Sequence, residues 1–249
     1  HSSYMGALPL PPQSTFTPLS LAPYANADTT RQGAMGVPAW PGEGDLSTLP
    51  KGRHELAGIP FNVLDPAVNG QRGCIGLSAR DEYDQKIELP VHATASAVYL
   101  LHTLAQVGPG GVGGRVTLHY IDGSSFSRYI VDGDNVLRWN HWEYLQAPRG
   151  DSCQIAWRGY DSKALNLQIV AYGLDNPNPE RTIERITLEA ADNGTIWYVL
   201  GLTLSDTAAY FAPGPISFGI PNGWGAAAVV YALVEGLAVG VRRDERPVL

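Results

Sequence analysis

The sequence predicts an all-β protein folded as a β-sandwich, and three observations lead to this prediction. Between residues 53 and 206, short apolar runs alternate with polar residues, a period of two that places one face of a strand in a core. The clearest run places Ile196, Tyr198, Leu200, Leu202 and Leu204 on one face. Turn residues such as Asp122-Gly123 separate the runs, and no run has the pattern of a long amphipathic helix. About ten strands at such spacing are typical of a sandwich.

The chain divides into three segments. Residues 1–50 are rich in proline, serine and threonine, and we expect an irregular, extended lead-in that packs on a sandwich formed by residues 51–206. Residues 207–249 combine a proline- and glycine-rich linker with an apolar stretch from Trp224 to Val241, for which we expect one C-terminal apolar helix. The stretch is long enough for a membrane span, but Glu235 and its many small residues argue against one. The helix would instead pack on the sandwich or on a second copy of the chain.

Net charge and cysteine content restrict the partners. The formal net charge is −7, and such a surface repels nucleic acid and anionic lipid. Neutral ligands such as sugars, and cations, stay compatible with it. Cys74 and Cys153 each follow the pattern of a strand, and either one disulfide or two buried free thiols would fit the sequence.

Six short motifs, in their order and spacing, resemble a known family. They are Gly58-Ile-Pro-Phe-Asn-Val-Leu-Asp65, Ala97-Val-Tyr-Leu-Leu-His102, Tyr120-Ile-Asp-Gly123, Asp134-Asn-Val with Trp139, Ala156-Trp-Arg-Gly159 and Asn176-Pro-Asn-Pro179. Together, over about residues 15–206, they are similar to the galactose-binding-like (NPCBM-like), jelly-roll domains of large bacterial glycoside hydrolases. The resemblance implies a jelly-roll, non-catalytic module that binds polysaccharide or oligosaccharide, binds a structural calcium, or braces a glycosidase catalytic domain.

The C-terminal segment carries a second resemblance. Residues 219–238 look like a segment of six-hairpin, (α/α)-barrel glycosidases, although the rest of such a barrel is absent. This resemblance implies a fragment or a stand-alone relic of a larger glycosidase. An extracellular or periplasmic location is expected on the same grounds, although the sequence as given shows no signal peptide.

An aromatic cluster is the first candidate binding site. Sugar rings stack on flat aromatic side chains while polar neighbours bind their hydroxyl groups. Trp142 lies in a short polar loop and suits this role, whereas Trp139 and Trp157 would equally be core residues of two strands. The candidate ligand-binding residues are Trp139, His141, Trp142, Tyr144, Arg158, Tyr160 and Asp161.

An acidic turn is the candidate metal site. Calcium takes six to eight oxygen ligands, and Asp132, Asp134 and Asn135 offer several within one turn. The spacing is not that of an EF-hand, and a plain hairpin turn is the alternative interpretation.

Two further functions are compatible with the residues. Asp81 and Glu82 are neighbouring carboxylates of the kind that cleaves a glycosidic bond, and His102 is a candidate acid or base, although a solvated loop also explains the carboxylates. A structural oligomerisation domain would use the C-terminal helix as its contact. No nucleophile elbow, P-loop or Rossmann fingerprint occurs, so we assign no catalytic residue.

Overall fold

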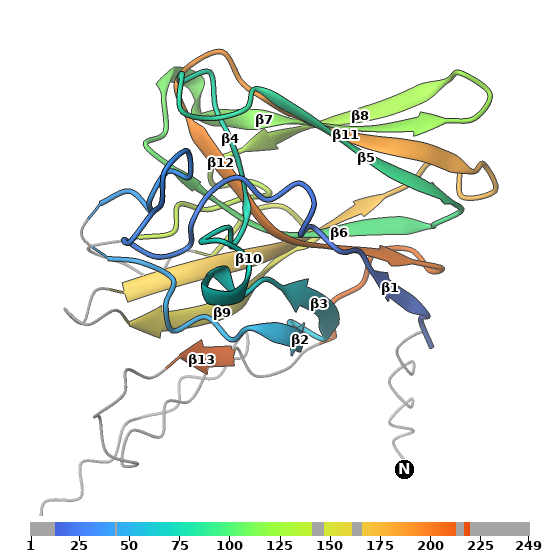
Figure 1. The fold of residues 1–249 in the computed structure, drawn as a ribbon. Coiled ribbons are helices and arrows are strands. Elements are labelled where there is room, and N and C mark those ends of the chain that lie inside the picture. Colours follow the sequence, from blue (N-terminus) through green and yellow to red (C-terminus); the bar gives the residue numbers. More distant parts are fainter. Residues whose placement is uncertain (1–12, 43, 141–146, 161–165, 213–216, 220–249) are drawn as a thin grey trace, which may run out of the picture.

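The protein is mostly β-strand, as predicted, and its strands form two stacked layers (Figure 1). The computed structural model describes residues 13–42, 44–140, 147–160, 166–212 and 217–219. Within these residues the helical elements are two short 3-10 turns, Pro66–Val68 and Pro109–Gly111. No helix among them is long and apolar enough to cross a membrane. The predicted C-terminal helix lies outside the described residues.

The smaller layer is a four-stranded antiparallel sheet in the order β5-β11-β7-β8. Its strands are β5 (Lys86–Ala93), β7 (Val112–Tyr120), β8 (Ser125–Val131) and β11 (Ile183–Ala190). One face is apolar and the other polar: β7, for example, places Val116, Leu118 and Tyr120 in the core, and Arg115, Thr117 and His119 alternate with them in sequence. This is the pattern expected of a sheet with one face on a core and one on solvent.

The larger layer is a seven-stranded sheet in the order β1-β12-β6-β10-β9-β13, with β4 also paired to β12. Its strands are β1 (Phe16–Pro18), β4 (Ile75–Leu77), β6 (Ala97–Ala105), β9 (Cys153–Tyr160), β10 (Asn166–Asp175), β12 (Ile196–Ser205) and β13 (Ser217–Gly219). A separate hairpin of β2 (Gly52–Leu56) and β3 (Ile59–Val63), drawn in the lower part of Figure 1, contacts β12 and β1 of this sheet through β3.

Two apolar clusters cover the two faces of the large sheet. The inter-sheet core lies between the layers and includes Leu100, Leu118, Ile186 and Trp197. The second cluster, here the outer core, joins the other face to the hairpin and the lead-in. Its members include Trp40, Leu46, Phe61, Tyr99 and Tyr198. Strand β6 is therefore buried along its whole length.

The alternation predicted for residues 196–204 does not persist along β12. Residues Ile196, Tyr198 and Leu200 face the outer core, whereas Leu202 and Leu204 face the inter-sheet core. A shift in the pairing of β12 with β6 between Val199 and Gly201 is the cause, because one extra residue reverses the side-chain alternation. The prediction of one continuous face was therefore wrong beyond Leu200.

Both cysteines are free. Cys74 is buried immediately before β4, where its backbone pairs with that of Ala27. Cys153 is half-buried at the start of β9. Burial raises the pKa of both thiols, so both stay protonated near neutral pH. Of the two interpretations of the sequence, the free thiols describe this structure.

Candidate functional site

The predicted aromatic cluster is in part a core feature. Trp139 is only 2% exposed and packs edge-on against Trp40, with 5.6 Å between ring centroids. Trp157 is also buried, so the core interpretation holds for both, and Trp139 offers no free ring face to a sugar. Arg158 is half-buried on β9, the strand that ends at Tyr160. The remaining candidates, His141, Trp142, Tyr144 and Asp161, lie outside the described residues.

The predicted calcium residues form the turn that follows β8. Asp132 pairs with Arg138, with 2.8 Å between carboxylate and guanidinium. Asn135 is 7% exposed, and its side chain is hydrogen-bonded to the main chain of β8. Its Oδ1 accepts from Val131 N–H at 2.8 Å, and its Nδ2 donates to Tyr129 C=O at 2.9 Å. Within the described part of the chain no three metal-ligating side chains gather. Calcium binding at Asp132, Asp134 and Asn135 stays a prediction.

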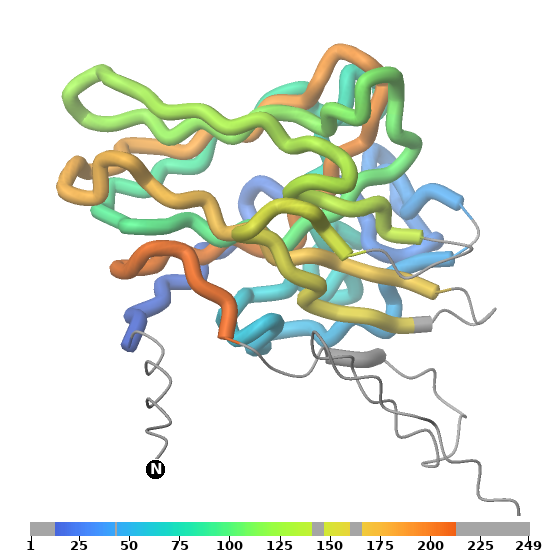
Figure 2. Tube along the Cα trace, turned by 180° about the vertical axis from the view of Figure 1, so that it is seen from behind, coloured from blue at the N-terminus to red at the C-terminus, as the bar shows by residue number. Residues whose placement is uncertain are grey.

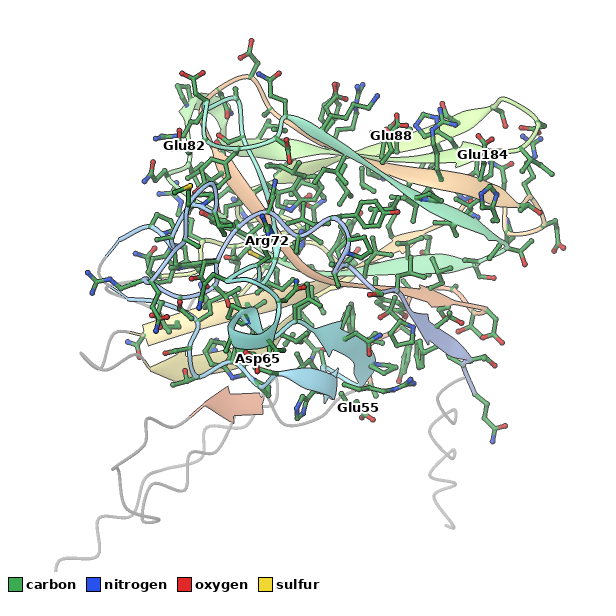
Figure 3. The ribbon with its side chains drawn as sticks, in the orientation of Figure 1. Glu55, Asp65, Arg72, Glu82, Glu88 and Glu184 are labelled. Atoms are coloured by element: carbon green, nitrogen blue, oxygen red, sulfur yellow. The ribbon has the colours of Figure 1, made fainter. Side chains whose placement is uncertain are left out.

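The carboxylates suggested for an enzyme lie on the surface. Asp81 and Glu82 are exposed in the turn before β5, and Figure 3 shows Glu82 at the periphery of the fold. The same figure shows Glu88 and Glu184 on the small sheet, whose polar face carries ion pairs such as Lys86–Glu88 and Arg185–Glu184. Exposed pairs of this kind contribute little to stability, and they describe a solvated face.

A cleft of about 450 Å³ opens beside the same turn. We call it the β8 cleft, and its lining residues come from three separate parts of the chain. They are Ser127, Arg128, Tyr129 and Val131 of β8, Asp134 and Asn135 of the turn, Gly150, Asp151 and Ser152 before β9, and Tyr172 of β10. Its volume falls in the range of about 300–1,000 Å³ that is typical of small-molecule sites.

The cleft exists because β8 is an edge strand of the small sheet. Among the described strands β8 pairs only with β7, which leaves its other side open. In Figure 2 the light green trace of the β7–β8 hairpin runs above the yellow and gold traces of β9 and β10. The open edge of β8 therefore forms one wall, and the segment before β9, with Tyr172, forms the other.

A buried polar chain supports the floor of the cleft. The Trp197 indole donates to His102 Nδ1 at 3.1 Å, and His102 Nε2 donates to the Asn135 carbonyl at 2.9 Å. His102 is fully buried, and this burial lowers its pKa to about 3 although the Asn135 carbonyl opposes the shift. The imidazole is thus neutral at pH 7, with the proton on Nε2. It positions the turn and takes no proton from a ligand.

The lining is rich in hydrogen-bonding groups and carries both charges. Arg128 supplies a guanidinium, and Asp134 and Asp151 supply carboxylates. Neither carboxylate forms an ion pair with a described residue. Tyr129 is 62% exposed, and the buried Tyr172 ring stacks on His102 with 6.1 Å between centroids. Burial raises the pKa of Tyr172, so its hydroxyl stays a donor. Such a site is suited to holding a polar ligand.

The sequence indicates the turn of this site but not the residues that face the turn across the cleft. Asp134 and Asn135 belong to a recognisable acidic turn, whereas nothing in the sequence distinguishes Arg128 and Tyr129 from other strand residues. Asp151 and Tyr172 reach the cleft only through the packing of one sheet on the other. The available signal is the composition of residues 125–131, a strand with two serines and a tyrosine on one side and an arginine between the apolar Phe126 and Ile130 on the other.

Comparisons with protein-family models, with curated proteins and with solved structures found no match.

Proposed function

We propose that this chain is a non-catalytic carbohydrate-binding or bracing module associated with a polysaccharide-degrading glycoside hydrolase, and that the β8 cleft is its sugar site. The observation that carries the proposal is the cleft itself, an open polar groove beside an exposed tyrosine. The jelly-roll, galactose-binding-like character and the extracellular or periplasmic location are part of the same proposal. So are a catalytic domain, or a second copy held through the C-terminal helix, as partners.

The lining suits sugar hydroxyl groups, each of which both donates and accepts a hydrogen bond. The carboxylates of Asp134 and Asp151 accept, the Arg128 guanidinium donates, and the Ser152 hydroxyl does both. Tyr129 adds an amphipathic ring with 62% of its surface exposed. The charged groups orient a ligand without an adjacent nucleophile, because the nearby Cys153 thiol has its pKa raised by burial and further by Asp134.

A glycan-array screen on the purified chain, with and without calcium, tests the proposal. Because Arg128 and Asp151 contribute charge-assisted hydrogen bonds to a bound sugar, we expect Arg128→Ala and Asp151→Ala each to weaken binding of the best glycan by about tenfold or more. Arg53→Ala is the matched control, because Arg53 is exposed on β2 and lies outside the cleft lining.

The same screen separates the cleft from the predicted aromatic loop. Loss of binding in Trp142→Ala, with Arg128→Ala unaffected, would place the sugar on the loop and contradict the cleft. Absence of any bound glycan would remove the carbohydrate-binding half of the proposal and leave the bracing half. Binding that disappears on chelation of calcium would support the metal predicted at Asp132, Asp134 and Asn135.

A further inference from the structure

The main-chain groups of β8 alternate between the small sheet and its open edge. At the hairpin end, Tyr120 N–H donates to Ser124 C=O at 2.9 Å, which makes these two residues a hydrogen-bonded pair. In an antiparallel ladder every second pair bonds in this way. Ser125, Ser127 and Tyr129, the alternate residues of β8, therefore turn their N–H and C=O groups away from β7.

This edge is occupied at one end and open at the other. The Asn135 side chain accepts from Val131 N–H at 2.8 Å and donates to Tyr129 C=O at 2.9 Å, so it occupies the edge at the end of the strand. Toward the hairpin, Ser125 and Ser127 are exposed, and no described residue bonds their main-chain groups on this side. Figure 2 shows this end of the β7–β8 hairpin, in light green, at the periphery of the molecule.

The opposite edge of the same sheet is built differently. Strand β5 contains Pro90, which has no N–H to offer, and His92, whose φ of 52° interrupts the extended backbone. Such features commonly protect an edge strand from pairing with another chain. Strand β8 has neither a proline nor a residue of positive φ. It is therefore the edge of this sheet to which a further strand can add.

We infer that β8 pairs antiparallel with β8 of a second copy of this chain, about a two-fold axis at Phe126. Ser125 then forms a hydrogen-bonded pair with Ser127 of the second copy, and Ser127 with its Ser125. This register satisfies every open main-chain group of both serines. A shift of two residues toward Val131 would instead direct a donor at the Tyr129 C=O, which Asn135 already bonds.

The side chains fit this register. Phe126 packs in part against the inter-sheet core and lies opposite its own copy, and aromatic pairs across strands are favourable. The Arg128 guanidinium lies 5.9 Å from the Phe126 ring centroid, on the same face of the strand. Arg128 is opposite Ser124 of the second copy, beside Asp122, an exposed carboxylate that also pairs with Arg181. The charges that meet across the axis are therefore opposite in sign.

A second copy suits this edge better than an unrelated peptide does. The open run is only two residues long, and a flexible peptide would lose conformational entropy to make so few hydrogen bonds. Strand β8 of a second copy is already held extended by β7, so it loses little. Each chain has a net charge of −7, but salt at about 0.15 M screens repulsion beyond about 8 Å.

Sedimentation equilibrium of the whole chain at about 0.15 M salt tests the inference. We expect the average mass to rise from monomer toward dimer between about 1 μM and 1 mM, because a small interface binds weakly. Ser127→Pro removes the N–H that bonds the second copy and spares the ladder with β7, whereas Ser127→Ala keeps that N–H. We expect Ser127→Pro to stay monomeric and Ser127→Ala to dimerise like the parent.

Two results of this measurement would overturn the inference. One is a parent that stays monomeric at every concentration, including a monomer that binds an extended peptide at β8. The other is a dimer that persists in Ser127→Pro with an unchanged circular dichroism spectrum, because the contact would then lie elsewhere, as in the C-terminal segment. Neither result bears on sugar binding, so the inference and the proposed function fail separately.

A cysteine at the axis tests the register without proline. Residue 126 forms a non-hydrogen-bonded pair with its own copy, with about 4.5 Å between Cα atoms, a distance that a disulfide spans. Residue 125 lies diagonally from its own copy, about 7–8 Å away, which is too far. We expect Phe126→Cys, but neither Ser125→Cys nor the parent, to give a disulfide-linked dimer on mild oxidation. If Ser127→Pro does not fold, absence of this crosslink in folded Phe126→Cys would overturn the inference.

Discussion

Replacing Trp197 by alanine is expected to lower the free energy of unfolding by about 4 kcal/mol. Trp197 is fully buried at the centre of the inter-sheet core. Its ring packs so closely on Gly114 that a Cβ added there would lie 2.7 Å from it. The substitution also removes the indole N–H that binds His102 Nδ1, which leaves a buried acceptor without a partner. Urea unfolding followed by circular dichroism gives the measurement.

Two further variants separate the causes of this loss. Trp197→Phe keeps most of the apolar burial and removes only the donor to His102, so we expect a loss of about 1–3 kcal/mol. Tyr129→Ala changes an aromatic residue that is 62% exposed and should stay within about 0.5 kcal/mol of the parent. A loss below about 1 kcal/mol for Trp197→Ala would show that Trp197 is not central to the inter-sheet core.

The stability of the protein is expected to fall by about 2 kcal/mol through His102 alone between pH 7 and pH 5. The pKa of His102 is lowered to about 3 in the folded state, from 6.5 in the unfolded chain. As the pH falls below 6.5, the unfolded state takes up a proton that the folded state refuses. The contribution of the neutral His102 to the free energy of unfolding is therefore complete above pH 6.5 and is lost progressively as the pH falls to about 3.

His102→Gln removes this titration while an amide side chain can still bind both neighbours. Urea unfolding at pH 7 and pH 5 should show a smaller pH dependence in His102→Gln than in the parent, with His54→Gln, on the exposed β2, as the control. Burial also lowers the pKa of His119, which acts in the same direction and persists in both proteins. An unchanged pH dependence in His102→Gln would contradict the buried neutral imidazole.

The β class could be predicted because half of the fold obeys a simple rule. Strands β7 and β11 place one face on the inter-sheet core and one on solvent, so their sequences alternate. Strand β6 is apolar on both sides, and only the existence of the outer core explains why. The pattern of residues within β6 does not show what covers its second face. In the structure the lead-in and the β2–β3 hairpin cover it.

Neither the reversal of side-chain direction within β12 nor the set of residues that line the cleft could be predicted from the sequence pattern, and the reasons are related. Gly201 marks the reversal, and a Cβ there would lie 2.9 Å from the Phe61 ring, a contact more than a hundred residues distant in sequence. The cleft likewise depends on how Tyr172 and Asp151 meet β8 across two sheets. Each is a consequence of tertiary packing, whereas the turn at Asp134 and Asn135 is local and was visible.

The position of β12 in the large sheet also bears on how the protein is made. Among the residues that the structure describes, this strand is the last long one, yet β1, β4 and β6 all pair with it. During synthesis the large sheet cannot close until Ser205 has left the ribosome. Until then, the apolar faces of the strands from Phe16 onward stay exposed to solvent. Exposed apolar strands of this kind can aggregate before slow folding is complete. Nascent chains stopped before β12 should therefore be clients of chaperones, and chains released after it should not.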